Sequence, residues 1–235
     1  MTTPVEDDDV ASWVKRISAA SEQGETLDLA KDHAANSADR NPAGGDKWGP
    51  ERQIPAAALR AVLTNRNLAV DPHGLRINGA RIVGPVDLEN IKFEHALYLT
   101  KCRFDCHIGL CGSTLKELNL SGSHIRSLNL DQATITGGLF ASDGFTATGE
   151  IRALAARISL LSMKGATLTN PDGNALLLDN ATITGGMFLD SGFTATGEIR
   201  ALGANISGQL SLNGAALTNP GGDALSLDRA AITGD

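Results

Sequence analysis

A large apolar residue stands at every fifth or sixth position of the chain from Ile77 onward. An α-helix repeats every 3.6 residues and a half-buried strand every two, so neither keeps this spacing. A chain that turns a corner every five or six residues does keep it, because each side then directs one large side chain inward and successive sides wind into a coil. The predicted inward residues are Ile77, Ile82, Leu88, Phe93, Leu99, Phe104, Leu110, Leu115, Leu120, Ile125, Leu130, Ile135, Phe140 and Phe145.

A small residue precedes the large one by two positions in alternate sides, as Ala80 precedes Ile82. Residues i and i−2 of an extended segment face the same way, so the small and the large side chain share a narrow interior. Glycine often precedes the small residue, and it suits a corner because it reaches positive φ at little cost. The predicted small interior residues are Ala80, Cys102, Ser113, Ser123, Ala133, Ala156, Ala166, Ala181, Ala204 and Ala215.

A longer unit repeats in the C-terminal half. The letters GFTATGEIRAL occur at 144–154 and again at 192–202, in a block that begins at Ala133 and returns at Ala181. The segments TNPDGN (169–174) and TNPGGD (218–223) break the short rhythm and indicate turns pushed outward from the coil. A third copy begins near Ala230. This third copy is short, and three explanations are open: truncation, an edge buried in a dimer, or a short natural copy of a longer array. We expect truncation or end-to-end association.

The segment LNLSGSHIRSLNLDQATITG (118–137) resembles the pentapeptide-repeat proteins, whose consensus is A-(D/N)-L-x-x. The resemblance covers about residues 75–235, although many sides have six residues and alternate sides show L-x-L. It implies an all-β fold, a right-handed quadrilateral β-helix. At roughly 20–24 residues per coil, the segment would make about seven coils. The longer unit is similar to arrays in actinobacterial proteins that are often labelled oxidoreductases.

Residues 1–70 lack the repeat, so we divide the chain into an N-terminal capping segment, 1–70, and a solenoid, 71–235. Residues 7–24 predict a helix with Val10, Trp13, Val14 and Ile17 on one face. Residues 36–53 indicate a polar loop that contains Trp48, and residues 54–67 a second short helix. Such a segment covers the open end of a solenoid. A separate binding role for the two tryptophans is the alternative.

The formal net charge of −7 limits the kinds of partner. An acidic surface repels nucleic acid and anionic lipid, so we expect no direct contact with nucleic acid or membrane, whereas a basic protein would be attracted. No apolar run reaches 18 residues, and the acidic start MTTPVEDDDV does not look like a signal peptide. The three cysteines lie close together and fit a reducing compartment. We therefore expect a cytoplasmic protein.

Cys102, Cys106, His107 and Cys111 form the densest group of chemically active residues. Three thiols and an imidazole can hold zinc, but this spacing matches no usual zinc knuckle. Neighbouring residues of a strand also face opposite ways, which separates Cys106 from His107. Since free cysteine is a common buried residue, we predict no metal and no cofactor, and keep these four as weak candidates.

Other polar motifs favour structure over catalysis. No catalytic triad, P-loop or G-x-G-x-x-G is present. Glu150 and Glu198, like Arg152 and Arg200, stand at equivalent positions of the repeat and predict a surface ladder. Threonine pairs T-x-T could order water on a flat face, as ice-binding proteins do, but their irregular intervals place them on different sides; β-propensity is the simpler explanation. The pairs are 134/136, 146/148, 167/169, 182/184 and 194/196.

We expect a non-enzymatic scaffold, a rigid acidic solenoid that binds another protein, as the function. Three alternatives stay open. The resemblance implies mimicry of DNA toward gyrase, which the scattered lysines and arginines disfavour. Rods could also join through the C-terminal coil into homo-oligomers. An enzyme of the oxidoreductase label would need a cofactor groove or clustered acid–base groups, which the sequence does not indicate.

Overall fold

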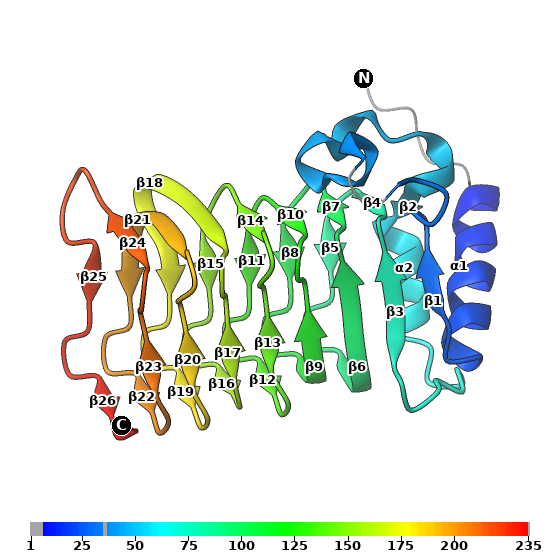
Figure 1. Cartoon of the computed structure of the whole chain (residues 1–235). Helices are drawn as coiled ribbons and strands as arrows, with labels where there is room; N and C mark the ends of the chain where they lie inside the picture. The colour runs from blue at the N-terminus through cyan, green and yellow to red at the C-terminus, as the bar shows by residue number, and fades with distance from the viewer. Residues whose placement is uncertain (1–6, 35–36, 235) are drawn as a thin grey trace.

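The computed structural model describes residues 7–34 and 37–234, where the chain forms a four-sided β-solenoid of about seven turns (Figure 1). Each turn crosses four faces, and strands of successive turns pair in parallel. The all-β solenoid with a helical N-terminal segment that the sequence predicts is confirmed. No helix in these two ranges is long and apolar enough to cross a bilayer.

Faces 1 and 2 begin with strands of the N-terminal segment. Face 1 consists of β1 (Thr26–Asp28), β3 (Leu75–Asn78), the second halves of β6 (Lys92–Thr100) and β9 (Thr114–Asn119), β13 (Leu139–Phe140), β17 (Leu161–Ser162), β20 (Met187–Phe188) and β23 (Leu210–Ser211). Face 2 consists of β2 (Gln53–Pro55), β4 (Arg81–Val83), β7 (Arg103–Phe104), β10 (His124–Ile125), β14 (Thr146–Ala147), the first halves of β18 (Thr167–Leu177) and β21 (Thr194–Arg200), and β24 (Ala216–Thr218).

Faces 3 and 4 complete each turn. Face 3 consists of β5 (Val86–Asp87), β8 (Ile108–Gly109), β11 (Leu128–Asn129), β15 (Ile151–Arg152), the second halves of β18 and β21, and β25 (Leu225–Ser226). Face 4 consists of the first halves of β6 and β9, β12 (Thr134–Ile135), β16 (Arg157–Ile158), β19 (Thr182–Ile183), β22 (Asn205–Ile206) and β26 (Ala231–Ile232).

The interior is filled by alternating large and small side chains, as the rhythm predicts. Ala80 and Ile82 are both fully buried, and so are Ala133 and Ile135. The predicted interior residues are buried, with two exceptions. Ala215, in the last turn, is partly buried, and Phe140 faces outward. Burying one such leucine or isoleucine side chain contributes on the order of 1.5–3 kcal/mol. Because each turn buries its side chains against its neighbours, stacking stabilises the solenoid.

The prediction that Phe140 faces inward is wrong. Leu139 and Ala141 occupy the two interior positions of this side, so the alternation of a strand turns Phe140 outward, where it is partly exposed. Two adjacent large residues, Leu139 and Phe140, made the five-residue count ambiguous here.

Two kinds of irregularity occur at the corners. Ala155 has a positive φ of 52°, a conformation that glycine adopts at its repeat equivalent, Gly203, with φ 63°. Between faces 2 and 3, the predicted outward turns at 169–174 and 218–223 both protrude, the first as a loop-like bulge within the long strand β18 and the second as a loop between β24 and β25 (Figure 1). Each is closed at its base by an asparagine: Asn170 Nδ2 donates to the Asn174 carbonyl at 2.7 Å, and Asn219 Nδ2 to the Asp223 carbonyl at 2.8 Å.

The N-terminal helices α1 (Asp7–Glu22) and α2 (Ala56–Leu63) lie at one end of the solenoid (Figure 1). Trp13 and Ile17 of α1 enter the core, as the predicted helix face requires. Beyond the prediction, β1 pairs with β3 and β2 with β4, so this segment also extends faces 1 and 2.

The expected polar loop, whose residue 36 lies outside the described ranges, contains the short 3-10 helices η1 (Ala38–Arg40), η2 (Pro42–Lys47) and η3 (Pro50–Arg52). Arg52 fixes it to the first turn. The Arg52 Nε donates to the Gly79 carbonyl at 2.8 Å, and its guanidinium lies 3.5 Å from the centre of the buried Trp48 ring. Burial of Trp13 and Trp48 favours packing over a separate binding role.

Candidate functional site

The four weak metal candidates do not come together. Cys102 is buried in a small interior position, with its Sγ 3.2 Å from the Thr100 carbonyl, and burial raises the pKa of its thiol to about 12. Cys106 and His107 lie at the corner between faces 2 and 3, whereas Cys111 lies at the corner between faces 3 and 4. All three cysteines are free. Within 7–34 and 37–234, no three Cys, His, Asp or Glu side chains converge as a metal site would require.

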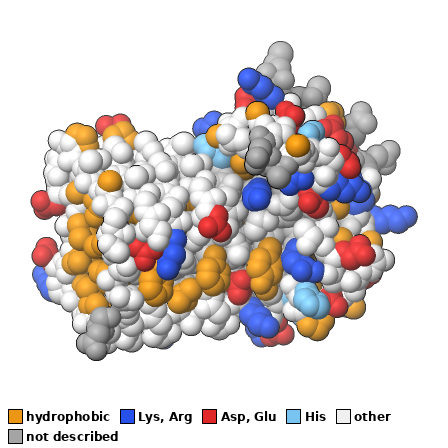
Figure 2. All heavy atoms as spheres, in the orientation of Figure 1, with side chains coloured by type: hydrophobic (Ala, Val, Ile, Leu, Met, Phe, Trp, Pro, Cys, Tyr) orange, Lys and Arg blue, Asp and Glu red, His pale blue; other side chains and the backbone are white. Residues whose placement is uncertain are grey.

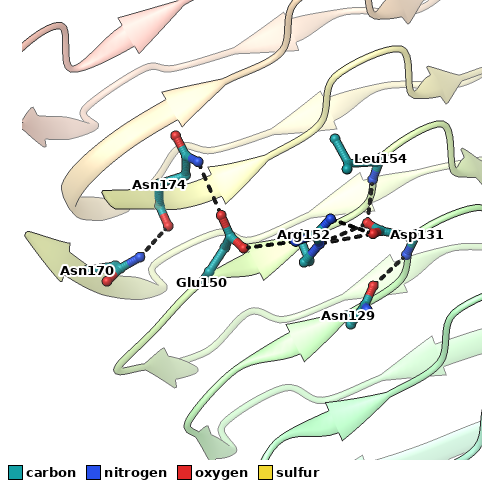
Figure 3. Close-up of polar contacts among 7 residues, drawn as sticks. All are labelled: Asn129, Asp131, Glu150, Arg152, Leu154, Asn170 and Asn174. Atoms are coloured by element: carbon teal, nitrogen blue, oxygen red, sulfur yellow. Dashed lines mark hydrogen bonds and ion pairs between the residues drawn. The ribbon is translucent and has the colours of Figure 1, made fainter. Parts of the chain in front are cut away.

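The predicted ladder residues Arg152 and Arg200 stand in one column of face 3, two turns apart with Leu177 between them. The contacts between consecutive turns are made with other residues, as Figure 3 shows for Arg152. Asp131 accepts hydrogen bonds from Arg152 and from the Leu154 N–H, the latter at 3.0 Å. Glu150 lies 3.7 Å from Arg152 Nη1 and accepts a hydrogen bond from Asn174 Nδ2 at 3.1 Å. The Asp131 carboxylate raises the pKa of Arg152. These contacts therefore join consecutive turns of face 3.

The expectation that the threonine pairs fall on different sides is wrong for three of them. Thr146, Thr167 and Thr194 stand in register on face 2, and Thr194 Oγ1 lies 3.1 Å from Thr167 Oγ1. The loop in β18 lengthens one turn, so the same position recurs after 21 and then 27 residues. The other two pairs lie on face 4, where Arg157 stands in register between Thr134 and Thr182. Because the turns differ in length, the interval between two pairs in the sequence does not show whether they share a face.

A row of aromatic side chains runs along face 1. Its members, Tyr98, Phe140 and Phe188, are partly exposed and define what we call the aromatic row. In the outward register of face 1 the order is Tyr98, Asn119, Phe140, Ser162, Phe188 and Ser211. Aromatic residues therefore occupy alternate turns, roughly 10 Å apart, with small polar residues between them. Figure 2 shows hydrophobic side chains spaced along this part of the surface.

The glycines before the two phenylalanines allow the rings to lie against the backbone. A Cβ atom on Gly138 would come within 2.8 Å of the Phe140 ring, and one on Gly186 within 2.7 Å of the Phe188 ring. Lys164 Nζ also lies 4.7 Å from the centre of the Phe188 ring. The rings are thus held in place by their own strands. The sequence carries a signal for this arrangement, because two glycines precede each phenylalanine in TGGLF and TGGMF.

Comparisons of the chain with protein-family models, with curated proteins and with solved structures find no match. The assignment of a parallel β-solenoid of about seven turns therefore rests on the structure alone.

Proposed function

We propose that the chain is a non-enzymatic scaffold that binds another protein through the aromatic row on face 1. The observation that supports this most is the placement of Tyr98, Phe140 and Phe188 in register on a ladder of paired strands. Aromatic residues are enriched at protein interfaces and often supply much of the binding energy. Side chains that are already held in place lose little conformational freedom when a partner binds.

The overall charge favours a partner with a basic contact surface. Residues 131–235 contain 10 aspartate and glutamate residues against 5 lysine and arginine residues, a net charge of −5. Arg152 and Arg200 are already occupied by Asp131 and Asp179. A basic partner would therefore be attracted to this half of the solenoid.

We also propose that the chain belongs to the pentapeptide-repeat class and acts in the cytoplasm. The four faces and the paired small and large interior residues, such as Ala133 and Ile135, support the class. The three free cysteines support a reducing compartment.

A pair of substitutions tests the aromatic row. Phe140→Ser with Phe188→Ser places at these positions the serine that Ser162 and Ser211 already provide on the turn that follows each of them. The variant should keep the melting temperature within a few degrees and lose the proteins that the wild-type chain captures from a cell extract. Thr136→Ala with Thr184→Ala is the matched control, since these exposed residues on face 4 are also 48 positions apart. Equal capture by both variants would show that the aromatic row is not the binding surface.

Self-assembly through the last turn is a second candidate. Leu217, Leu225 and Leu227 are only partly buried there, and Ile232 is 41% exposed. Figure 2 shows hydrophobic side chains at this end of the solenoid. A second copy could cover them. Light scattering should show a mass that rises with concentration, and Ile232→Asp should reduce it; a constant monomer mass would exclude this function.

Mimicry of DNA toward gyrase is the alternative that the resemblance suggests. Pairing of Asp131 and Asp179 with arginines reduces the free negative charge of face 3 and disfavours it. Supercoiling by gyrase should be unchanged in the presence of excess protein, and inhibition would replace the scaffold proposal.

A further inference from the structure

We infer that the outer edge of residues 92–94, at the start of face 4, is a docking strand for an extended, acidic peptide segment of another protein. The first strands of the other faces are covered. Faces 1 and 2 start with β1 and β2, and α2 contacts β5 at the start of face 3. The first half of β6 pairs with β9 on one side, and in the described ranges no strand pairs with its other side.

The backbone of this edge offers hydrogen-bonding groups. Thr114 N–H donates to the Ile91 carbonyl at 2.8 Å, so that carbonyl points toward β9. A trans peptide directs the next N–H the opposite way, and the direction alternates along a strand. The N–H groups of Lys92 and Glu94 therefore point away from β9, toward the open side. Unpaired edge groups of this kind are what an added strand recognises.

A groove of about 610 Å³ lies along the same edge. Residues 89–95 form one wall, and the end of α2 with residues 64–70 forms the other. The lining includes the buried side chains of Ile91 and Phe93 and the partly buried Leu68 and Val70. An extended segment placed here could bond to the edge with its backbone and set alternate apolar side chains against Leu68 and Val70.

The charges of the groove select an acidic segment. Arg60, Arg66 and Lys92 line it, against Glu89 and Glu94. Lys92 is paired with Glu94 at 2.7 Å, and Arg60 with Asp87 at 3.3 Å. Arg66 has no ion-pair partner among the described residues. Because Asp87 and Glu94 already neutralise Arg60 and Lys92, Arg66 is the cation left to attract an acidic residue of the peptide.

A capped peptide of alternating aspartate and valine, five residues long, is the probe. At saturation it should slow amide hydrogen exchange at Lys92 and Glu94 at least tenfold in the full chain. In an extended strand the Lys92 carbonyl lies on the same side as the Lys92 N–H and can accept a hydrogen bond from the peptide. A version N-methylated at every residue cannot donate to this carbonyl and should bind at least tenfold more weakly. Arg66→Glu should weaken binding of the unmodified peptide to a similar degree, whereas Arg157→Glu, an equal charge change at an exposed residue elsewhere on face 4, should not.

Failure to bind at millimolar peptide, unchanged exchange at Lys92 and Glu94, or equal binding of the N-methylated peptide would overturn the inference. The Phe140→Ser, Phe188→Ser variant should bind the peptide normally, because the groove and the aromatic row are separate surfaces. The two proposals can therefore fail independently.

Discussion

Arg152 contacts Asp131 of the preceding turn through three hydrogen bonds. Its Nη2 lies 2.7 Å and its Nε 3.0 Å from Oδ2, and Nε also lies 3.2 Å from Oδ1. The same contact recurs between Arg200 and Asp179, where Nη2 lies 3.0 Å from Oδ2. Each contact joins two residues that are 21 positions apart in the sequence, on consecutive turns, and the contact repeats with the 48-residue unit.

Asp131→Ala should lower the free energy of unfolding by about 1–2 kcal/mol, because it removes the arginine contact and the acceptor of the Leu154 N–H. A double-mutant cycle with Arg152→Ala should give a coupling below about 1 kcal/mol that shrinks in 1 M salt, since Arg152 is partly exposed. Denaturant unfolding measures both. A zero coupling in low salt would contradict the role given to this pair.

Ile183→Asp should prevent stable folding of the C-terminal turns. Ile183 is 0% exposed, and a buried, unpaired carboxylate is among the most destabilising changes a core can receive. Thr182→Asp is the control, because the neighbouring side chain points outward. Circular dichroism during heating measures the loss. If both variants melted like the wild type, the inside and outside positions would be wrongly assigned.

Ala155→Gly should stabilise the protein by about 0.5–1 kcal/mol, because alanine at positive φ is strained and glycine is not. The reverse change at the equivalent corner, Gly203→Ala, should destabilise it. There a new Cβ would also approach Asn180 Oδ1 to 3.0 Å. Opposite shifts in the denaturant midpoint are expected, and shifts of the same sign would show that this conformation does not decide stability.

Stability should depend on Cys102 at alkaline pH. Burial raises the pKa of this thiol from its ordinary value of 9.0 to about 12, so the unfolded chain ionises it at a lower pH than the folded chain. The contribution to stability is complete below about pH 9 and decreases as pH rises toward 12, by up to about 1.4 kcal/mol per pH unit. Cys102→Ala fits the interior, as Ala80 and Ala133 do, and should flatten this slope. Equal slopes between pH 8 and 10.5 would contradict the assignment.

The sequence was sufficient for the solenoid because interior spacing is a local property. A small and a large residue two positions apart already show which side chains face the interior, as Ala80 with Ile82 and Ala133 with Ile135 do. The aromatic row was not predicted, since Leu139 and Phe140 are both large and only strand pairing shows which one faces inward. The stacking of Thr167 on Thr194 was missed because the loop changes the length of that turn. The groove along Lys92 exists because the first strand of face 4 has no paired strand on its outer side. The spacing of apolar residues does not show which strands are paired.

The two loops closed by Asn170 and Asn219 have a practical consequence. Paired strands continue on both sides of each loop, so added residues leave the ladder intact. These corners are therefore natural places to graft foreign peptides. Two grafted peptides would lie two turns apart and project from the same edge, so the solenoid would present two epitopes at a fixed separation.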